Sequence, residues 1–214
     1  MLVGNDIVDL HDPWSQSDKI HARFDSRVFT SIENSYISAS NSAHRSRWLL
    51  WAAKESTFKV ARKINAKTQF FPKKFIVRMT GKTSAEVVHD SIRFGVCFEI
   101  TDEWLHALAE PIHQNANSFD PSCSRSHTCV RSVNIEELGI SSNHKSSFVR
   151  EVARTTASSL VNILPGDIEI INKSGVPFFF CQGERLPIGL SLSHHGRFVA
   201  CALAMDESLK LSSA

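Results

Sequence analysis

The sequence contains no apolar run of the roughly 18 residues that a membrane-spanning helix needs. Its first residues, Met1 to Asp6, carry no basic flank ahead of an apolar segment, so we expect neither export nor membrane insertion. The five cysteines are odd in number and include no C-x-x-C pair. This argues against a disulfide framework and against a structural zinc site. We therefore expect a cytoplasmic protein with no membrane partner.

Net charge is also small, at +2, but it is unevenly distributed. Eleven of the 24 lysine and arginine residues fall between Arg45 and Lys82. Such a cluster either attracts an anion or forms an ordinary solvated helix face. No helix-turn-helix, RNP or zinc-finger signature accompanies it, so nucleic acid is not expected as a partner. With 42% hydrophobic residues, the 214-residue chain can bury the core of one large domain or of two small lobes.

The segment Arg45 to Ile64 spaces its apolar residues as an amphipathic helix does. Short β-strands are predicted after it at 75–79, 84–89 and 93–100, separated by turn signals such as Gly81-Lys82. A helix followed by a strand meander is typical of an α+β protein.

This plan returns about one hundred residues later. His44-Arg-Ser-Arg-Trp48 is echoed by His144-Lys-Ser-Ser-Phe148, and residues 95–110 match 189–205 with one gap. Two matches in the same order indicate an internal duplication. We predict an α+β fold of two similar lobes related by a pseudo-twofold axis, each with a helix packed on a small antiparallel sheet. The expected boundaries are a first lobe at 1–110, a linker at 111–132 and a second lobe at 133–214.

Three segments could carry chemistry. The β-branched run Val3 to Leu10 holds two acids, Asp6 and Asp9, which are poor residues for a buried strand unless one caps a strand end. On the predicted helix, Glu55 and Lys59 are four apart and share a face, as in an ordinary i,i+4 ion pair.

The third segment, Leu190 to Leu203, reads as two strands joined by the polar turn Ser193 to Arg197, which could equally be a solvated loop. Its adjacent histidines, at 194 and 195, would point to opposite sides of an extended chain, so joint metal binding by both is not expected.

In residue type and order, these segments resemble the 4′-phosphopantetheinyl transferase superfamily. The family pattern of G-x-D-[IV], then W/F-x-x-K-E-[SA]-x-x-x-K, then an S-x-S-H-type strand, reads here as Gly4-Asn-Asp6-Ile7, Trp51 to Lys59, and Leu192 to Phe198. The resemblance implies transfer of the phosphopantetheine arm of coenzyme A to a serine of an apo acyl, polyketide or peptidyl carrier protein. The second product is adenosine 3′,5′-bisphosphate.

The resemblance also implies roles for individual residues. Asp6 and Glu55 would hold Mg²⁺, a hard ion that prefers oxygen ligands. Asp6, Glu55 and Lys59 would form the catalytic set, and Glu55 is our candidate to accept the serine proton. The residues expected to contact coenzyme A are Lys54, Lys59, Ser193, His194 and Arg154.

Three departures from the family pattern qualify these expectations. Val8 stands where two-lobed relatives commonly have a third metal carboxylate, the metal-binding lobe comes first in the chain, and Val176 replaces the lysine of a G-K-P turn. In the second copy, Arg154-Thr155 replaces Lys54-Glu55, so we expect one active site per chain and a monomer with two pseudo-dimeric lobes. The competing interpretations are a degenerate coenzyme A- or nucleotide-binding module without turnover, and a purely structural protein.

Overall fold

The computed structural model describes residues 1–16, 19–112, 126–132 and 142–205. Most of the predicted linker, residues 113–125, and the first residues of the predicted second lobe, 133–141, lie outside these ranges. No helix in the described part of the chain is long and apolar enough to cross a membrane.

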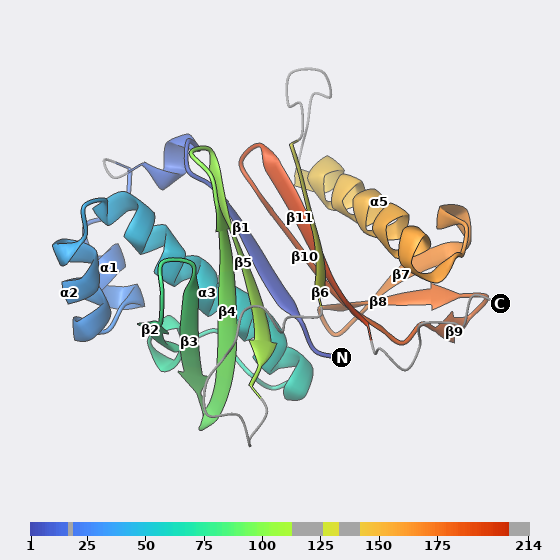
Figure 1. Ribbon diagram of the computed structural model, residues 1–214, viewed down its shortest axis with the longest axis horizontal. Coiled ribbons are helices and arrows are strands. Elements are labelled where there is room, and N and C mark those ends of the chain that lie inside the picture. Colours follow the sequence, from blue (N-terminus) through green and yellow to red (C-terminus); the bar gives the residue numbers. More distant parts are fainter. Residues whose placement is uncertain (17–18, 113–125, 133–141, 206–214) are drawn as a thin grey trace.

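The first lobe is a five-stranded antiparallel sheet with one long helix against it (Figure 1). The strand order is β1 (Gly4–Asp9), β5 (Trp104–Pro111), β4 (Ile92–Ile100), β3 (Ser84–His89) and β2 (Ile76–Met79). The helix α3 (Ala43–Ile64) buries Trp48, Leu49, Ala52, Ala53 and Val60 at helical spacing. The predicted helix and strands of this region are confirmed to within two residues.

Capping and charge explain where α3 begins and ends. The Ser42 side chain accepts a hydrogen bond from the Arg45 amide at the N-terminus, and the last turn carries Arg62 and Lys63. Cations suit the C-terminal end of a helix dipole. Two shorter helices, α1 (Phe24–Val28) and α2 (Ser31–Ala39), precede α3, and α2 packs on it.

The second lobe repeats this plan with two three-stranded sheets and one helix. Its elements are β6 (Ser126–Ser132), α5 (Ser142–Val161), β7 (Ile168–Lys173), β8 (Val176–Cys181), β9 (Glu184–Arg185), β10 (Ile188–His195) and β11 (Phe198–Met205). Strand β11 lies between β10 and β6, as β5 lies between β4 and β1. Helix α5 contacts β10 and β11, and the predicted α+β fold of two similar lobes is thereby confirmed.

Strand β6 corrects one sequence expectation. Residues 126–132 were assigned to the linker because they are polar, but they pair with β11 from Ser126↔Ala204 to Ser132↔Phe198. An edge strand can carry polar side chains without cost when one of its faces meets solvent. The seven residues therefore belong to the second sheet.

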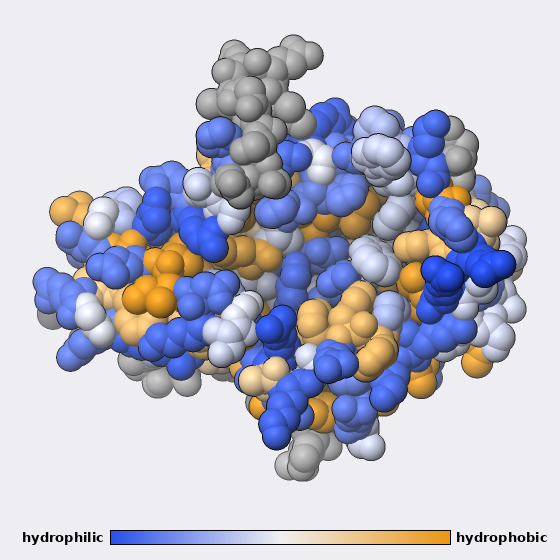
Figure 2. Space-filling view, turned by 180° about the vertical axis from the view of Figure 1, so that it is seen from behind, coloured by the Kyte–Doolittle hydropathy of each residue, from blue (hydrophilic) through white to orange (hydrophobic). Residues whose placement is uncertain are grey.

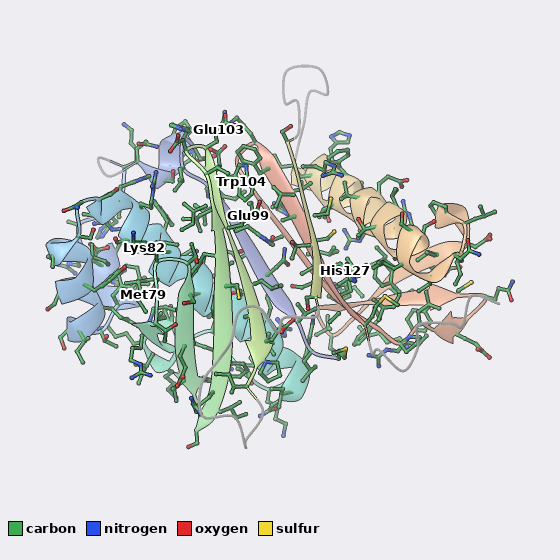
Figure 3. The ribbon with its side chains drawn as sticks, viewed as in Figure 1. Met79, Lys82, Glu99, Glu103, Trp104 and His127 are labelled. Atoms are coloured by element: carbon green, nitrogen blue, oxygen red, sulfur yellow. The ribbon has the colours of Figure 1, made fainter. Side chains whose placement is uncertain are left out.

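The two lobes pack directly on each other, with β1 lying beside β10 and β11 (Figure 1). Small side chains on β11 allow the sheets to approach, because Ile7 packs with Ala200 and Phe198, and Val3 packs with Ala202 and Ala204. Trp104, labelled in Figure 3, lies where the sheets meet, with its ring centroid 6.3 Å from that of Phe198. Both halves of the predicted site thus come from one chain.

Candidate functional site

Glycine at position 4 allows β1 to press against α3. A Cβ atom there would collide with the carbonyl oxygen of Ser56 and lie 2.8 Å from a methyl carbon of Val60. The close approach brings Asp6 to α3, where Lys59 Nζ lies 3.3 Å from Asp6 Oδ1. Lys59 also donates to the carbonyl of Asn5 at 2.6 Å. The first motif is therefore held against the second by backbone packing.

Asp6 and Glu55 form an electrostatically coupled pair of acids. Burial raises the pKa of Asp6, although the neighbouring Lys59 ammonium opposes the shift. Burial, followed by the Asp6 carboxylate, raises the pKa of Glu55 to about 7. Because the Asp6 carboxylate raises the pKa of Glu55, a cation placed beside the two acids would favour their ionised forms. The Asp6 side chain keeps 15% of its exposure, enough for a ligand to reach it.

This donor set fits a hard divalent ion that shares its coordination with substrate and water. Among the described residues, no three His, Cys, Asp or Glu side chains gather into a group able to hold a metal ion. The described residues therefore do not supply a complete set of protein ligands for a metal ion. Two carboxylates that face a substrate phosphate are the arrangement that Mg²⁺ commonly uses.

The second lobe meets the acids through a buried polar network centred on Asn5. The Asn5 amide N–H donates to Ser191 Oγ at 3.0 Å, and its side-chain Nδ2 donates to Ser193 Oγ at 2.9 Å. Nδ2 also lies 3.1 Å from His106 Nε2. Burial, with a smaller effect of Lys59, lowers the pKa of His106 to about 4, so the ring is neutral and Nε2 can accept. These bonds fix β10 beside Asp6.

The β10–β11 turn is shorter than the sequence predicted. The five residues from Ser193 to Arg197 were expected to form it, but β10 continues through His195 and only Gly196 and Arg197 lie between the strands. Gly196 adopts φ +51°, which favours glycine. Ser193 is therefore a buried strand residue that holds Asn5, while the neighbouring His194 is exposed. Burial and the charges of Lys145 and Lys59 lower the pKa of His194, so it lies within electrostatic range of the site.

The second acid of β1, Asp9, joins the lobes instead of binding a ligand. Its carboxylate accepts from the Arg197 backbone N–H at 2.9 Å and from Nε and Nη2 of the same residue at 2.9 and 3.0 Å. Burial alone would raise the pKa of Asp9, but hydrogen bonds from Arg197 and His11 outweigh it and hold the pKa below its ordinary value. His195, on the side opposite His194, accepts from the Asp9 amide at 3.1 Å.

Lys54 does not reach the cleft, and the expectation that it binds phosphate is corrected. Its side chain is 0% exposed, and Nζ lies 2.8 and 2.9 Å from the two carboxylate oxygens of Glu33. Nζ also donates to the carbonyls of Pro72 and Phe75 at 3.1 and 2.6 Å. All of its donors point into the first lobe, about 100° around the helix from Glu55. Lys54 is a structural residue.

Arg154 is likewise displaced from its expected place. It forms an ion pair with Glu151 on its own helix, and the basic residue of α5 that lines the nearest cavity is Arg150, one turn earlier. This cavity, of about 280 Å³, lies between the lobes and is also lined by Lys59, Arg62 and Lys63. Figure 2 shows hydrophilic residues along the middle of the face seen from behind, between more apolar regions to either side. The sequence identified the basic segment but not which of its members face the other lobe.

Three comparisons with known proteins show what the chain is similar to. A family model described as ACPS, 4′-phosphopantetheinyl transferase superfamily, matches residues 2–109, half of the chain. A search of curated proteins gives no match. Among solved structures, the crystal structure of Thermotoga maritima holo-[acyl-carrier-protein] synthase (AcpS) is similar at 13% identity and a TM-score of 0.38, covering 86% of this chain and 84% of that one.

The chain belongs to the 4′-phosphopantetheinyl transferase superfamily. Members of this family transfer phosphopantetheine, use coenzyme A as substrate and act on carrier proteins.

Proposed function

We propose that this protein transfers 4′-phosphopantetheine from coenzyme A to the acceptor serine of an apo carrier protein, in a Mg²⁺-dependent reaction of the holo-[acyl-carrier-protein] synthase type. The single observation that supports it is the convergence of Asp6, Glu55 and Lys59, from two elements of the first lobe, beside the serine-histidine strand of the second. The side chains of Asp6 and Lys59 are partly exposed between the lobes. The pKa values of Asp6 and Glu55 are both raised there.

Asp6 and Glu55 are the residues that would hold the metal. When bound, the metal would neutralise phosphate charge and orient the pyrophosphate for in-line displacement. Two carboxylates without a cation repel each other and any phosphate, which explains why we expect divalent metal to be required.

The chain's own residues supply the remaining functions. The serine oxygen forms a bond to the pantetheine-side phosphorus while the bond from that phosphorus to the bridging oxygen breaks, releasing adenosine 3′,5′-bisphosphate. Lys59 stabilises the negative charge that develops on the leaving phosphate. Glu55 accepts the proton of the serine hydroxyl. His194, exposed on β10, contacts the nucleotide, and Ser193 positions Asn5 and β1.

Mass spectrometry of carrier proteins tests this proposal. Apo acyl, polyketide and peptidyl carrier proteins are incubated with the enzyme, coenzyme A and Mg²⁺, and a gain of one phosphopantetheine is expected for at least one of them. Glu55→Gln and Lys59→Met should lower the rate at least about a hundredfold, the scale typical of removing one catalytic group. Arg45→Ala, on the same helix but paired with Asp102 at the surface, is the matched control.

Coenzyme A binding without transfer to any carrier would instead identify a non-catalytic binding module. Full activity of Glu55→Gln would refute the assigned site.

A further inference from the structure

The lobes meet at a seam between two edge strands. Strand β1 lies at the edge of the five-stranded sheet and β10 at the edge of a three-stranded sheet, and the two strands lie side by side (Figure 1). No backbone hydrogen bond joins them within the described ranges. Edge groups that are removed from water need other partners. Side chains must therefore supply the hydrogen bonds of the seam.

Two N–H groups of β1 are satisfied by side chains of β10. The Asn5 amide donates to Ser191 Oγ at 3.0 Å, and the Asp9 amide donates to His195 Nδ1 at 3.1 Å. Both acceptors belong to the second lobe. The exchange rates of these two amide hydrogens therefore report how firmly the lobes are held together.

Lys63, near the end of α3, joins carbonyl groups of the two lobes. Its Nζ atom donates to the carbonyl of Val3, just before β1, at 2.6 Å and to that of Leu190, on β10, at 2.5 Å. Burial, and next the positive charge of Lys59, lower the pKa of Lys63 to about 7, so both the ammonium and the neutral amine are populated at neutral pH. A neutral amine still has two N–H groups, one for each carbonyl. The bridge therefore needs the amine but not its charge.

Lys59, one turn earlier on α3, forms a weaker bridge. Its Nζ atom donates to the Asn5 carbonyl at 2.6 Å, but the Leu192 carbonyl of the second lobe lies 3.4 Å away, beyond the usual range. The third contact is with the Asp6 carboxylate, at 3.3 Å. Three acceptors use all the donors of an ammonium, so Lys59 can contact a phosphate only by releasing one of them. The longest contact, to Leu192, is the one most easily lost.

Given the proposed function, on which this inference rests, we propose that Lys63 is a positioning residue that holds β10 against β1 while Lys59 contacts the substrate. Two of its donors are taken by the protein, one on each side of the seam, so Lys63 acts through the strands. Without this bridge the lobes would separate more often, and only the closed fraction would bind coenzyme A between them. Loss of Lys63 should then affect the KM for coenzyme A more than kcat.

Amide hydrogen exchange, measured by NMR for individual residues without ligand, tests the bridge itself. In Lys63→Met, the amides of Asn5 and Asp9 are expected to exchange at least about tenfold faster than in the parent. The Val77 amide should change by less than about twofold, because it donates to the Glu33 carboxylate inside the first lobe. An equal increase at Val77 would indicate a general loss of stability and would overturn the proposal.

Steady-state transfer to a carrier protein tests the functional consequence. Lys63→Met should raise the KM for coenzyme A about tenfold and change kcat by less than about threefold. Lys67→Met is the matched control, because it makes the same replacement at an exposed lysine four residues further on. Its exchange rates and KM should lie within about twofold of the parent.

Lys63→Gln serves if Lys63→Met does not fold. Glutamine keeps two N–H donors but its side chain is one bond shorter, so the same changes are expected at a smaller scale of at least about threefold.

The outcomes separate this inference from the proposed function. If the parent transfers phosphopantetheine but the Asn5 and Asp9 amides exchange at the parent's rates in the Lys63 variants, the bridging role is wrong and the transferase assignment stands. A large loss of kcat at unchanged KM would also overturn it, because Lys63 would then belong to the catalytic set. If the parent modifies no carrier but the two amides exchange faster in Lys63→Met, the bridge stands and the proposed function is wrong.

Discussion

Replacing Lys54 by methionine tests whether this lysine stabilises the fold or binds phosphate. The Nζ group is fully buried, pairs with Glu33 and donates to two backbone carbonyls. Burial lowers the pKa of Lys54, opposed by the hydrogen bonds and charge of Glu33. Methionine has a similar length but supplies neither charge nor donors, so the variant leaves a buried carboxylate without its cation.

Removal of one partner from a buried ion pair typically costs about 3–5 kcal/mol. We expect about 3 kcal/mol for Lys54→Met, at the lower end of that range, because the Glu33 carboxylate keeps hydrogen bonds from the amides of Thr30 and Val77, each at 2.8 Å. Urea denaturation should show a lower midpoint with an unchanged slope. The double variant Lys54→Met/Glu33→Gln should recover part of the loss, because no buried charge then remains unpaired.

Activity distinguishes the two interpretations of Lys54. At a temperature where the variant remains folded, its kcat and its KM for coenzyme A should lie within about twofold of the parent, since no catalytic contact has been removed. Lys59→Met provides the contrast, because it should lose transfer activity even at a temperature where it remains folded. A Lys54→Met protein of unchanged stability with a KM for coenzyme A raised tenfold or more would refute this reasoning.

Three further predictions follow from the site and the lobe boundary. In metal-free protein, Glu55 has a folded-state pKa of about 7 against 4.5 for the unfolded group, so the free energy of unfolding should fall by up to about 3 kcal/mol as pH rises through that window. Urea titrations at pH 5 and 8 should show a smaller fall for Glu55→Gln than for the parent, because only Asp6, whose pKa burial also raises, then remains to titrate; equal falls in the two proteins would contradict the raised pKa of Glu55. Gly4→Ala places a Cβ against a carbonyl oxygen of α3, which should lower the free energy of unfolding by about 1–3 kcal/mol and abolish transfer because Asp6 moves. Calorimetric melting measures the stability and carrier mass spectrometry the transfer; full activity would contradict the close approach of β1 to α3. Arg197→Ala removes the guanidinium that pairs with the buried Asp9 carboxylate and should lower the free energy of unfolding by about 2 kcal/mol, with little recovery in Arg197→Lys. Equal melting temperatures for the parent and both variants would contradict a stabilising role of this ion pair.

Periodicity made much of the fold predictable. The helix α3 and strands β2 to β4 carry enough apolar residues at spacings of 3.6 or 2 to be located from the sequence. Strand β6 was missed because an edge strand needs few apolar side chains, so Ser126 to Ser132 has the composition of a loop. The extent of the β10–β11 turn was misjudged because His194 and His195 are polar, although both continue the ladder.

The candidate site was predictable only in part, because direction on a helix can be read from spacing but tertiary neighbours cannot. Spacing places Lys54 about 100° from Glu55, which already indicates that the two residues face different surroundings. Nothing in the sequence indicates that Lys54 pairs with Glu33 inside the first lobe. Nor does it indicate that Arg62 and Arg150 line the cleft while Arg154 lies one turn away. These facts depend on how α2 and the second lobe pack on α3.

The duplication also explains why two similar lobes would provide one metal site. Ala107-Leu108-Ala109 on β5 corresponds to Ala202-Leu203-Ala204 on β11. Since Asp6 pairs with Ala107 and Thr128 with Ala202, the second-lobe counterpart of Asp6 is Thr128. Glu55 corresponds to Thr155 in the same way, so both acids are threonine in the second copy. Thr155 is exposed, whereas Glu55 is partly buried beside Asp6. The second copy therefore lacks both the carboxylates and the desolvated surroundings that make the first pair favour a cation.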